Sequence, residues 1–436
     1  MTHAIKGFAT QTNELIIERL PIHGSIPTWL NGQLLRNGPA IFDVGADTYN
    51  HWFDGLAMLH RFGFADGNVS YSNKLLRSEG YEAAHAQGKI SRTEFATDPC
   101  RSIFKRFATL FVEGDASNNT NVNVARLADR YVAMTETPIP VEFDPITLET
   151  VGVYDYAGDV DGQMTTAHPH HDFATGQTFN FVSKFGRVPS YNIYSIGHDG
   201  RTRTLIASLP IDEIAYMHSF AVTKTYIILA EFPVTVRPLD LLLKGKTFAE
   251  NLVWRTERPM KFRLIRRNTG VLEHTIEAPQ RFSFHHVNAF ERDNAVIVDM
   301  VTYPDSRLID QLYLASLRDP FHGAYNGGQL ERFILPLDGS AVSSQVLSQE
   351  CYELPRINYH HANMNDYRYA YGISNHQRIP DNHANQLVKT DVQHGVDHVW
   401  HEPKCYPGEP VFVSAPNATN EDDGVILSVV LDGEAG

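Results

Sequence analysis

Short apolar runs, rich in β-branched and aromatic residues, recur along the whole chain. Clear examples lie at residues 131–134, 225–229, 294–298 and 425–430. Runs of this kind predict β-strands. Asp-Gly dipeptides separate many of them, at positions 66–67, 199–200, 338–339 and 423–424. Because glycine tolerates the positive φ that tight hairpin turns require, these dipeptides predict antiparallel connections.

This pattern predicts an all-β protein and leaves a propeller, a sandwich and a barrel open. Because no clean internal repeat is visible, a propeller would have blades of divergent sequence. No low-complexity linker interrupts the pattern, so we expect a single domain over residues 1–436. No apolar run approaches the roughly 18 residues that a membrane-spanning helix needs.

Acidic residues outnumber basic ones, with 51 Asp and Glu against 37 Lys and Arg, for a formal net charge of −14. This balance argues against a nucleic-acid-binding groove. The three cysteines, Cys100, Cys351 and Cys405, are widely spaced. They indicate neither a disulfide framework nor a thiolate metal site, and they favour a reducing, cytoplasmic setting. The unusual feature is histidine, with 21 residues.

Three histidines lie beside predicted strands in separate parts of the chain: His168, His218 and His285. Their separations correspond to about one or two blades of a propeller, and the inner ends of different blades converge on the propeller axis. Such spacing would bring three imidazoles to one metal ion. Taken alone, the pattern does not identify a metal, because most histidines beside aromatic residues are ordinary polar residues. That ordinary interpretation is kept for His170, His171, His286, His360 and His361.

A series of motifs resembles the carotenoid oxygenase family, in the family's own order from about residue 35 to the end. The resemblance is strongest to the branch that holds the animal β-carotene cleavage enzymes and the retinoid isomerase of the retinal pigment epithelium. The motifs are Leu-Arg-Asn-Gly-Pro (35–39), His-Trp-Phe-Asp-Gly-Leu-Ala-Met-Leu-His (51–60), Thr-Glu-Thr (135–137), Thr-Leu-Glu-Thr (147–150), Ala-His-Pro-His (167–170), Met-His-Ser-Phe (217–220), Phe-His-His-Val-Asn-Ala (284–289), Glu-Leu-Pro-Arg-Ile-Asn (353–358), Gly-Glu-Pro-Val-Phe-Val (408–413) and Glu-Asp-Asp-Gly (421–424).

The resemblance implies a seven-bladed β-propeller with a cap of loops and short helices over the iron site. It implies iron(II) on the propeller axis, bound by four histidines, with O₂ as co-substrate. His168, His218 and His285 match three of these ligands. Neutral imidazoles leave the charge of the dication uncompensated, and they leave one side open for O₂ and substrate.

The same resemblance assigns supporting roles around the metal. Each imidazole needs an acceptor for its second N–H, which fixes its tautomer. The family match gives this role to Glu136, Glu353 and Glu409, and we expect Glu136 to orient His218 and Glu353 to orient His285. Thr135 matches the hydroxyl residue that borders the open coordination position.

The match breaks near the C-terminus. The family carries its fourth histidine beyond the motif at 421–424, and no residue up to Gly436 matches that ligand or the strands that close the last blade. We therefore expect an incomplete last blade and a Glu409 without its partner. Two explanations stay open: the chain is a shortened form of a full enzyme, which we favour, or it has a three-histidine site.

The implied activity is oxidative cleavage of a C=C bond of a carotenoid or apocarotenoid, which yields aldehyde products such as retinal. Alternatives on the same scaffold are cleavage of a stilbene-type compound and isomerisation of a retinoid. A non-catalytic carotenoid-binding propeller is the rival from a different class. Because carotenoids dissolve in membranes, we also expect peripheral membrane contact through an apolar patch. The patch residues would be Phe232, Leu239, Leu241, Leu242 and Leu243; the alternative for this stretch, which stays open, is a helix packed on the propeller.

Overall fold

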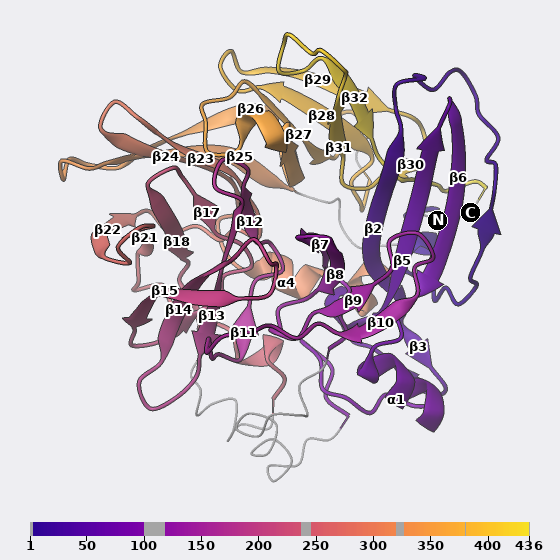
Figure 1. Ribbon diagram of the computed structural model, residues 1–436, viewed down its shortest axis with the longest axis horizontal. Coiled ribbons are helices and arrows are strands. Elements are labelled where there is room, and N and C mark those ends of the chain that lie inside the picture. The colour runs from indigo at the N-terminus through magenta and orange to yellow at the C-terminus, as the bar shows by residue number, and fades with distance from the viewer. Residues whose placement is uncertain (1–2, 100–117, 237–245, 320–326, 380, 436) are drawn as a thin grey trace.

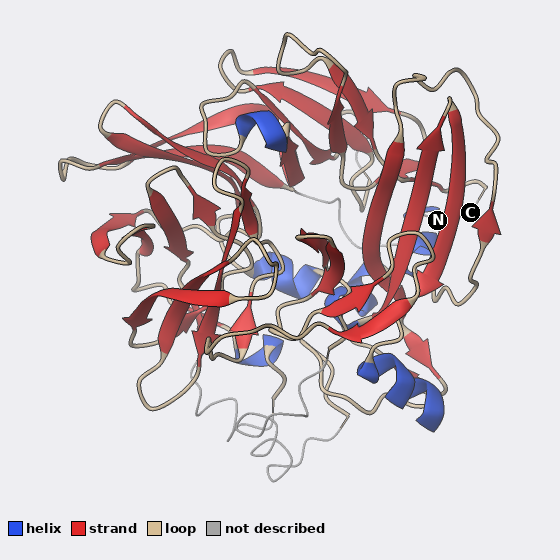
Figure 2. Ribbon diagram, viewed as in Figure 1, coloured by secondary structure: helices blue, strands red, loops and turns tan. Residues whose placement is uncertain are grey.

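The computed structural model describes residues 3–99, 118–236, 246–319, 327–379 and 381–435. β-Sheets dominate these residues and stand side by side around a common centre, with few helices between them (Figures 1 and 2). Neighbouring strands pair antiparallel within each sheet. Radially repeated antiparallel sheets are the blades of a propeller, so the predicted all-β propeller is confirmed.

The first three blades follow one another along the chain. Blade 1 has the order β2-β5-β6-β1. Its strands are β2 (Gly32–Ile41), β5 (Leu56–Ala65), β6 (Asn68–Leu75) and β1 (Ile16–Ile17). Blade 2 consists of β7 (Asn123–Leu127), β8 (Arg130–Met134), β9 (Val141–Phe143) and β10 (Thr150–Val153). Blade 3 consists of β11 (Met164–Thr165), β12 (His170–Asp172), β13 (Gln177–Lys184), β14 (Ser190–Ile196) and β15 (Arg203–Pro210).

Blades 4, 5 and 6 continue the same meander. Blade 4 consists of β17 (Ala221–Val222), β18 (Tyr226–Glu231), β21 (Met260–Arg266) and β22 (Leu272–Ala278). Blade 5 consists of β23 (His286–Arg292), β24 (Ala295–Thr302), β25 (Gly328–Pro336) and the first part of β26 (Ser343–Ile357). Blade 6 starts with the end of β26 and continues with β27 (Tyr369–Ser374), β28 (Gln386–Asp391) and β29 (Val396–His401).

Blade 7 is a two-stranded hairpin in the part of the chain that the structure describes. Its strands are β31 (Val411–Ser414) and β32 (Gly424–Leu427), extended by the pair β30 (Cys405–Pro407) and β33 (Val430–Asp432). The hairpin lies between blade 6 and blade 1 (Figure 1). The expected incomplete last blade is therefore present in this structure.

Smaller elements connect the blades. Two minor sheets are formed by β3 (Asp43–Val44) with β4 (Asp47–Thr48), and by β16 (Ile214–Ala215) with β19 (Val234–Val236) and β20 (Val253–Trp254). The helical segments are η1 (His3–Phe8), η2 (Trp52–Asp54), α1 (Glu79–Gln87), η3 (Ala249–Asn251), α4 (Arg307–Gln311), α5 (Leu314–Leu317) and α6 (Tyr359–Ala362).

The hydrophobic pattern explains these elements. All eight residues of β24 are buried, as expected for a continuous apolar run covered on both faces. The turn between β5 and β6 contains Asp66 and Gly67 with φ of 49° and 71°, as their sequence predicts. The Asp-Gly pair at 423–424 does not form the predicted hairpin turn. Gly424 begins β32, and the Asp423 carboxylate accepts a hydrogen bond from the Asn420 backbone N–H in the preceding loop.

Candidate metal centre

Three blades bring three histidines to one point. His168 comes two residues before β12, His218 lies between β16 and β17, and His285 immediately precedes β23. One ligand nitrogen from each ring lies within 4.8 Å of the other two. The Nε2 atoms of His168 and His218 are 3.0 Å apart. The structure thus brings together the residues that the sequence singled out as metal ligands.

Two carboxylates fix the tautomers of two of these rings. Glu136 Oε1 lies 2.7 Å from His218 Nδ1, and Glu353 Oε2 lies 2.6 Å from His285 Nδ1. A carboxylate only accepts, so each Nδ1 carries the proton and each Nε2 keeps its lone pair. The expected pairings, Glu136 with His218 and Glu353 with His285, are the ones that the structure contains.

Tyrosine hydroxyls hold both carboxylates in place. Tyr216 donates to Glu136 Oε1 at 2.9 Å, and Tyr303 donates to Glu353 Oε1 at 3.0 Å. The backbone N–H of Leu354 also donates to Glu353, at 2.6 Å. The sequence did not single out Tyr216, Tyr303 or Leu354. Only Tyr216 lies near a predicted ligand in the sequence, two residues before His218.

The donor set fits a divalent cation. Burial, followed by repulsion from His218 and His285, holds the pKa of His168 well below its usual value, so the ring is neutral. For His285, burial is the largest single effect and lowers the pKa, but the charge and hydrogen bond of Glu353, together with the charge of Glu409, raise the pKa overall. With the His168 proton on Nε2, this ring donates to His218 Nε2; with the proton on Nδ1, the two Nε2 lone pairs face the same point and can bind a cation there. Neutral imidazoles are common ligands of iron, zinc, copper and nickel, so the residues fit such an ion.

Aromatic rings cover one side of the cluster. Phe53 stacks on His218 with centroids 6.0 Å apart, and Phe284 meets the same ring edge-on at 5.2 Å. Phe95 extends this surface, because it contacts both Phe53 and Tyr216. This side of the cluster is therefore apolar.

A cavity of about 1290 Å³, lined by both polar and apolar side chains, lies at the inner strands of the blades and reaches the cluster. We call it the axial cavity. Its walls come from the inner strands of several blades, including β2, β7, β12, β23, the end of β26 and β31. His168 and His285 line it, as do Arg356 and Glu409.

Glu409 is not left without a partner, which corrects the expectation from the sequence. Arg356 donates from Nε to Glu409 Oε1 at 2.8 Å, and Arg36 donates to the Glu409 main-chain carbonyl at 2.8 Å. Burial raises the pKa of Glu409, but the charges of Arg356 and Arg36 outweigh burial and lower it. Arg356 belongs to the Glu-Leu-Pro-Arg motif, so its presence was visible in the sequence while its contact was not.

The remaining predicted site residues have varied positions. Thr135 is half-buried between the end of β8 and Glu136. Phe232 is 2% exposed and packs against Phe282, so it belongs to the core and not to a membrane-facing patch. Leu239, Leu241, Leu242 and Leu243 lie outside the described residues. Among the residues that are described, no helix is long and apolar enough to cross a bilayer.

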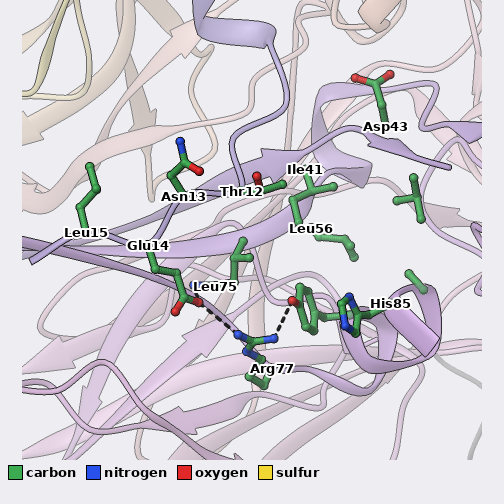
Figure 3. Close-up of a pocket in the computed structure, with 13 residues that line it drawn as sticks. Thr12, Asn13, Glu14, Leu15, Ile41, Asp43, Leu56, Leu75, Arg77 and His85 are labelled. Carbon is green, nitrogen blue, oxygen red and sulfur yellow. Dashed lines mark hydrogen bonds and ion pairs between the residues drawn. The ribbon is translucent and has the colours of Figure 1, made fainter. Parts of the chain in front are cut away.

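A second cavity, of about 680 Å³, lies beside blade 1 and α1 (Figure 3). Arg77 donates to the Tyr81 hydroxyl and lies 3.3 Å from the Glu14 carboxylate, which Figure 3 shows beside it. The histidine cluster does not line this cavity, so it is separate from the candidate metal centre.

Comparisons with known proteins agree with the fold and the site. The family described as "Retinal pigment epithelial membrane protein" matches residues 8–436. The chain therefore belongs to this family, the carotenoid oxygenases, as its motifs predicted. It is 34% identical over 478 residues to the human mitochondrial carotenoid-cleaving dioxygenase, covering 94% of this chain and 81% of the relative.

Two further relatives extend the comparison. The human β,β-carotene 15,15′-dioxygenase is 32% identical over 473 residues, which cover 95% of this chain and 85% of the relative. A mutant of the Synechocystis apocarotenoid oxygenase has the same fold, with a TM-score of 0.86 and 27% identity over 99% of this chain and 91% of that chain.

Proposed function

We propose that this protein is an iron(II)-dependent dioxygenase that cleaves a C=C bond of a carotenoid or apocarotenoid to give aldehyde products. The observation that carries the proposal is the convergence of His168, His218 and His285, with ligand nitrogens within 4.8 Å of one another. The relatives are named for carotenoid cleavage, which supports the same reaction class here.

The proposed ligands of the iron are the Nε2 atoms of the three histidines. When bound, iron(II) would supply the redox chemistry that O₂ needs to react with an alkene. One of the similar solved structures is a cobalt-substituted form of the Synechocystis enzyme, which supports a metal ion in a protein of this fold. Glu136 and Glu353 would keep His218 and His285 in the tautomer that binds metal.

The aromatic side of the cluster suits the polyene. Phe53, Phe284 and Phe95 offer flat apolar faces, on which a conjugated chain can lie without loss of hydrogen bonds. These rings exclude water from the reacting bond and hold it at a fixed distance from the histidines. We further propose that the Thr135 hydroxyl borders the reacting position, because it directly precedes Glu136.

The test combines metal content with product analysis on this 436-residue chain. The protein is loaded with Fe(II) without oxygen, desalted, and assayed with β-carotene or an apocarotenal in detergent under ¹⁸O₂. We expect close to one iron per chain and labelled aldehydes, and we expect His218→Ala to remove both. His274→Ala, which changes a histidine of β22, is the matched control.

Other outcomes would overturn the proposal in recognisable ways. Geometric isomers of a retinoid without oxygen consumption would indicate isomerisation. Polyene binding without iron-dependent turnover would indicate a carotenoid-binding protein. Equal iron content in the wild type and in His218→Ala would show that the three histidines do not form the site.

A further inference from the structure

We propose that the axial cavity is the path by which the metal ion reaches the three histidines, so that metal and polyene approach the site from different sides. This inference rests on the proposed function, because it assigns a route to the ion of that same site. Three observations support it: where the cavity ends, which groups line it, and what covers the His218 ring.

The cavity ends at the ligands. Its walls include His168 and His285, whereas His218 does not line it and is 4% exposed. A divalent ion moves with a shell of about six waters, which occupy about 180 Å³ at about 30 Å³ each. The cavity volume of about 1290 Å³ accommodates such an ion with room for its shell.

The walls offer oxygen atoms along the way. His170 donates from Nε2 to the Phe220 carbonyl at 2.8 Å, so its Nδ1 accepts from the Tyr359 hydroxyl at 3.1 Å. The Glu409 carboxylate also lines the cavity, beside Arg356. Both nitrogens of His170 are already hydrogen-bonded, so the groups that can replace waters of the ion are the Glu409 carboxylate and the Tyr359 oxygen. Arg36 and Arg356 lie on the same wall and oppose the approach of a cation.

One wall residue has an unused lone pair. Ser219 donates its hydroxyl to the Phe284 carbonyl at 2.6 Å, so the 2.8 Å contact between Ser219 Oγ and His286 Nδ1 requires the proton on His286 Nδ1. His286 Nε2 is then a lone-pair atom. It is buried and has no hydrogen-bond partner within the described part of the chain. Because this atom is closed off from solvent, it does not contact the water shell of an ion in the cavity and adds nothing to the route.

The aromatic rings that contact His218 are not part of the cavity wall. Phe53 is nearly parallel to the His218 ring with centroids 6.0 Å apart, and Phe284 meets it edge-on at 5.2 Å. An ion that approached through these rings would lose its waters without replacement, at a cost of several kcal/mol for a single charge and more for a dication. A polyene pays no such cost, because it has no polar groups to desolvate. The two reactants therefore suit different sides.

The experiment blocks the cavity reversibly and follows metal uptake. In a background in which Cys100, Cys351 and Cys405 are replaced by serine, Val413→Cys places a thiol on the cavity wall. A bulky methanethiosulfonate reagent is attached there and later removed with a reductant. The probe is Co(II), whose binding is followed by its visible absorption, so the measurement does not depend on turnover.

We expect the attached group to slow Co(II) uptake by about tenfold or more, with the same final stoichiometry, and we expect the reductant to restore the rate. Metal loaded before labelling should be released more slowly to a chelator. The control is Val151→Cys on β10, where the side chain is 63% exposed and does not line the cavity. Its labelling should leave the rate unchanged.

Failure of the route differs from failure of the proposed function. If quantitatively labelled Val413→Cys takes up Co(II) at the unlabelled rate, the route is wrong. Ser414→Cys, also on the cavity wall, replaces this variant if its unfolding midpoint shows misfolding. If His218→Ala without any label binds Co(II) as well as the parent does, the metal site itself is wrong, whatever the labelled variants do.

Discussion

Glu353 and Arg356 are three residues apart on β26, yet both reach groups beside the axial cavity. Glu353 contacts His285 at 2.6 Å, and Arg356 contacts Glu409 at 2.8 Å. In a regular strand, side chains three residues apart point to opposite faces. Here the register with β27 shifts between these two residues, and Leu354 has a φ of 47°. One extra residue on β26 therefore turns both side chains to the same side.

We predict that the left-handed backbone at Leu354 reverses the usual order of strand substitutions. A β-branched side chain is strained at positive φ, so Leu354→Val should be less stable than Leu354→Gly by about 1–2 kcal/mol. The control is Leu387 in β28, a half-buried leucine outside the positive-φ set, where glycine should be the worse replacement. Urea unfolding of the four variants gives the comparison, and the same order at both positions would contradict the prediction.

The carboxylates that orient the histidines should control metal affinity. Glu136→Gln and Glu353→Gln remove the negative acceptor and allow the other tautomer, so metal affinity should fall about 10- to 100-fold. Competition with a chelator for Co(II) measures this change. Glu213→Gln, which removes a half-buried ion pair with Arg255 and Arg258, is the control and should keep full affinity. Unchanged Co(II) affinity in both Glu136→Gln and Glu353→Gln would show that these carboxylates do not support metal binding.

The buried pair of Arg332 and Asp299 should make a large contribution to stability. The two side chains are 4% and 0% exposed and form two hydrogen bonds, at 2.8 and 2.7 Å. Arg332→Met leaves the Asp299 charge buried, so the free energy of unfolding should fall by about 3–5 kcal/mol. Combining it with Asp299→Asn should recover part of this loss.

An exposed pair provides the control for this stability prediction. Arg307 pairs with Asp305, and the arginine side chain is 79% exposed. Arg307→Met should therefore change the free energy of unfolding by less than about 1 kcal/mol. Equal losses in Arg307→Met and Arg332→Met would show that burial does not set the cost.

His51 should make the protein sensitive to acid. Burial lowers its pKa from 6.5 to about 4, although its hydrogen bond to the Ile309 carbonyl opposes this. Between these values the unfolded chain binds a proton that the folded protein does not. The contribution of neutral His51 to the free energy of unfolding is therefore fully present above about pH 6.5. It decreases by about 1.4 kcal/mol per pH unit as the pH falls toward 4.

The comparison with His51→Asn isolates this effect. Asp54 acts in the opposite direction, because burial raises its pKa to about 6, but it is present in both proteins. The stability difference between wild type and variant should shrink as the pH falls from 6.5 to 4. A constant difference across this range, measured by urea unfolding, would contradict the assignment to His51.

Much of the fold was predictable because strands and turns depend on local sequence. The runs at 131–134 and 294–298 correspond to β8 and β24, and the Asp66-Gly67 turn joins two strands as expected. The prediction that Phe232 belongs to a membrane-facing patch was wrong. The sequence alone does not distinguish an apolar residue in a buried strand connection from one on a membrane-facing surface. Periodicity alone also did not choose the propeller among all-β folds, since that choice depends on how whole sheets pack.

The sequence by itself determined which residues are available at the site: three histidines, Glu136 and Glu353, each within a motif that resembles the family. Only the tertiary structure decided what these residues contact. His168 and His218 are separated by 50 residues, and their 3.0 Å approach depends on the angle between two blades. The pairing of Glu409 with Arg356 depends likewise on how blade 7 packs against blade 6. Contacts between distant segments are set by the packing of complete sheets, which no local pattern encodes.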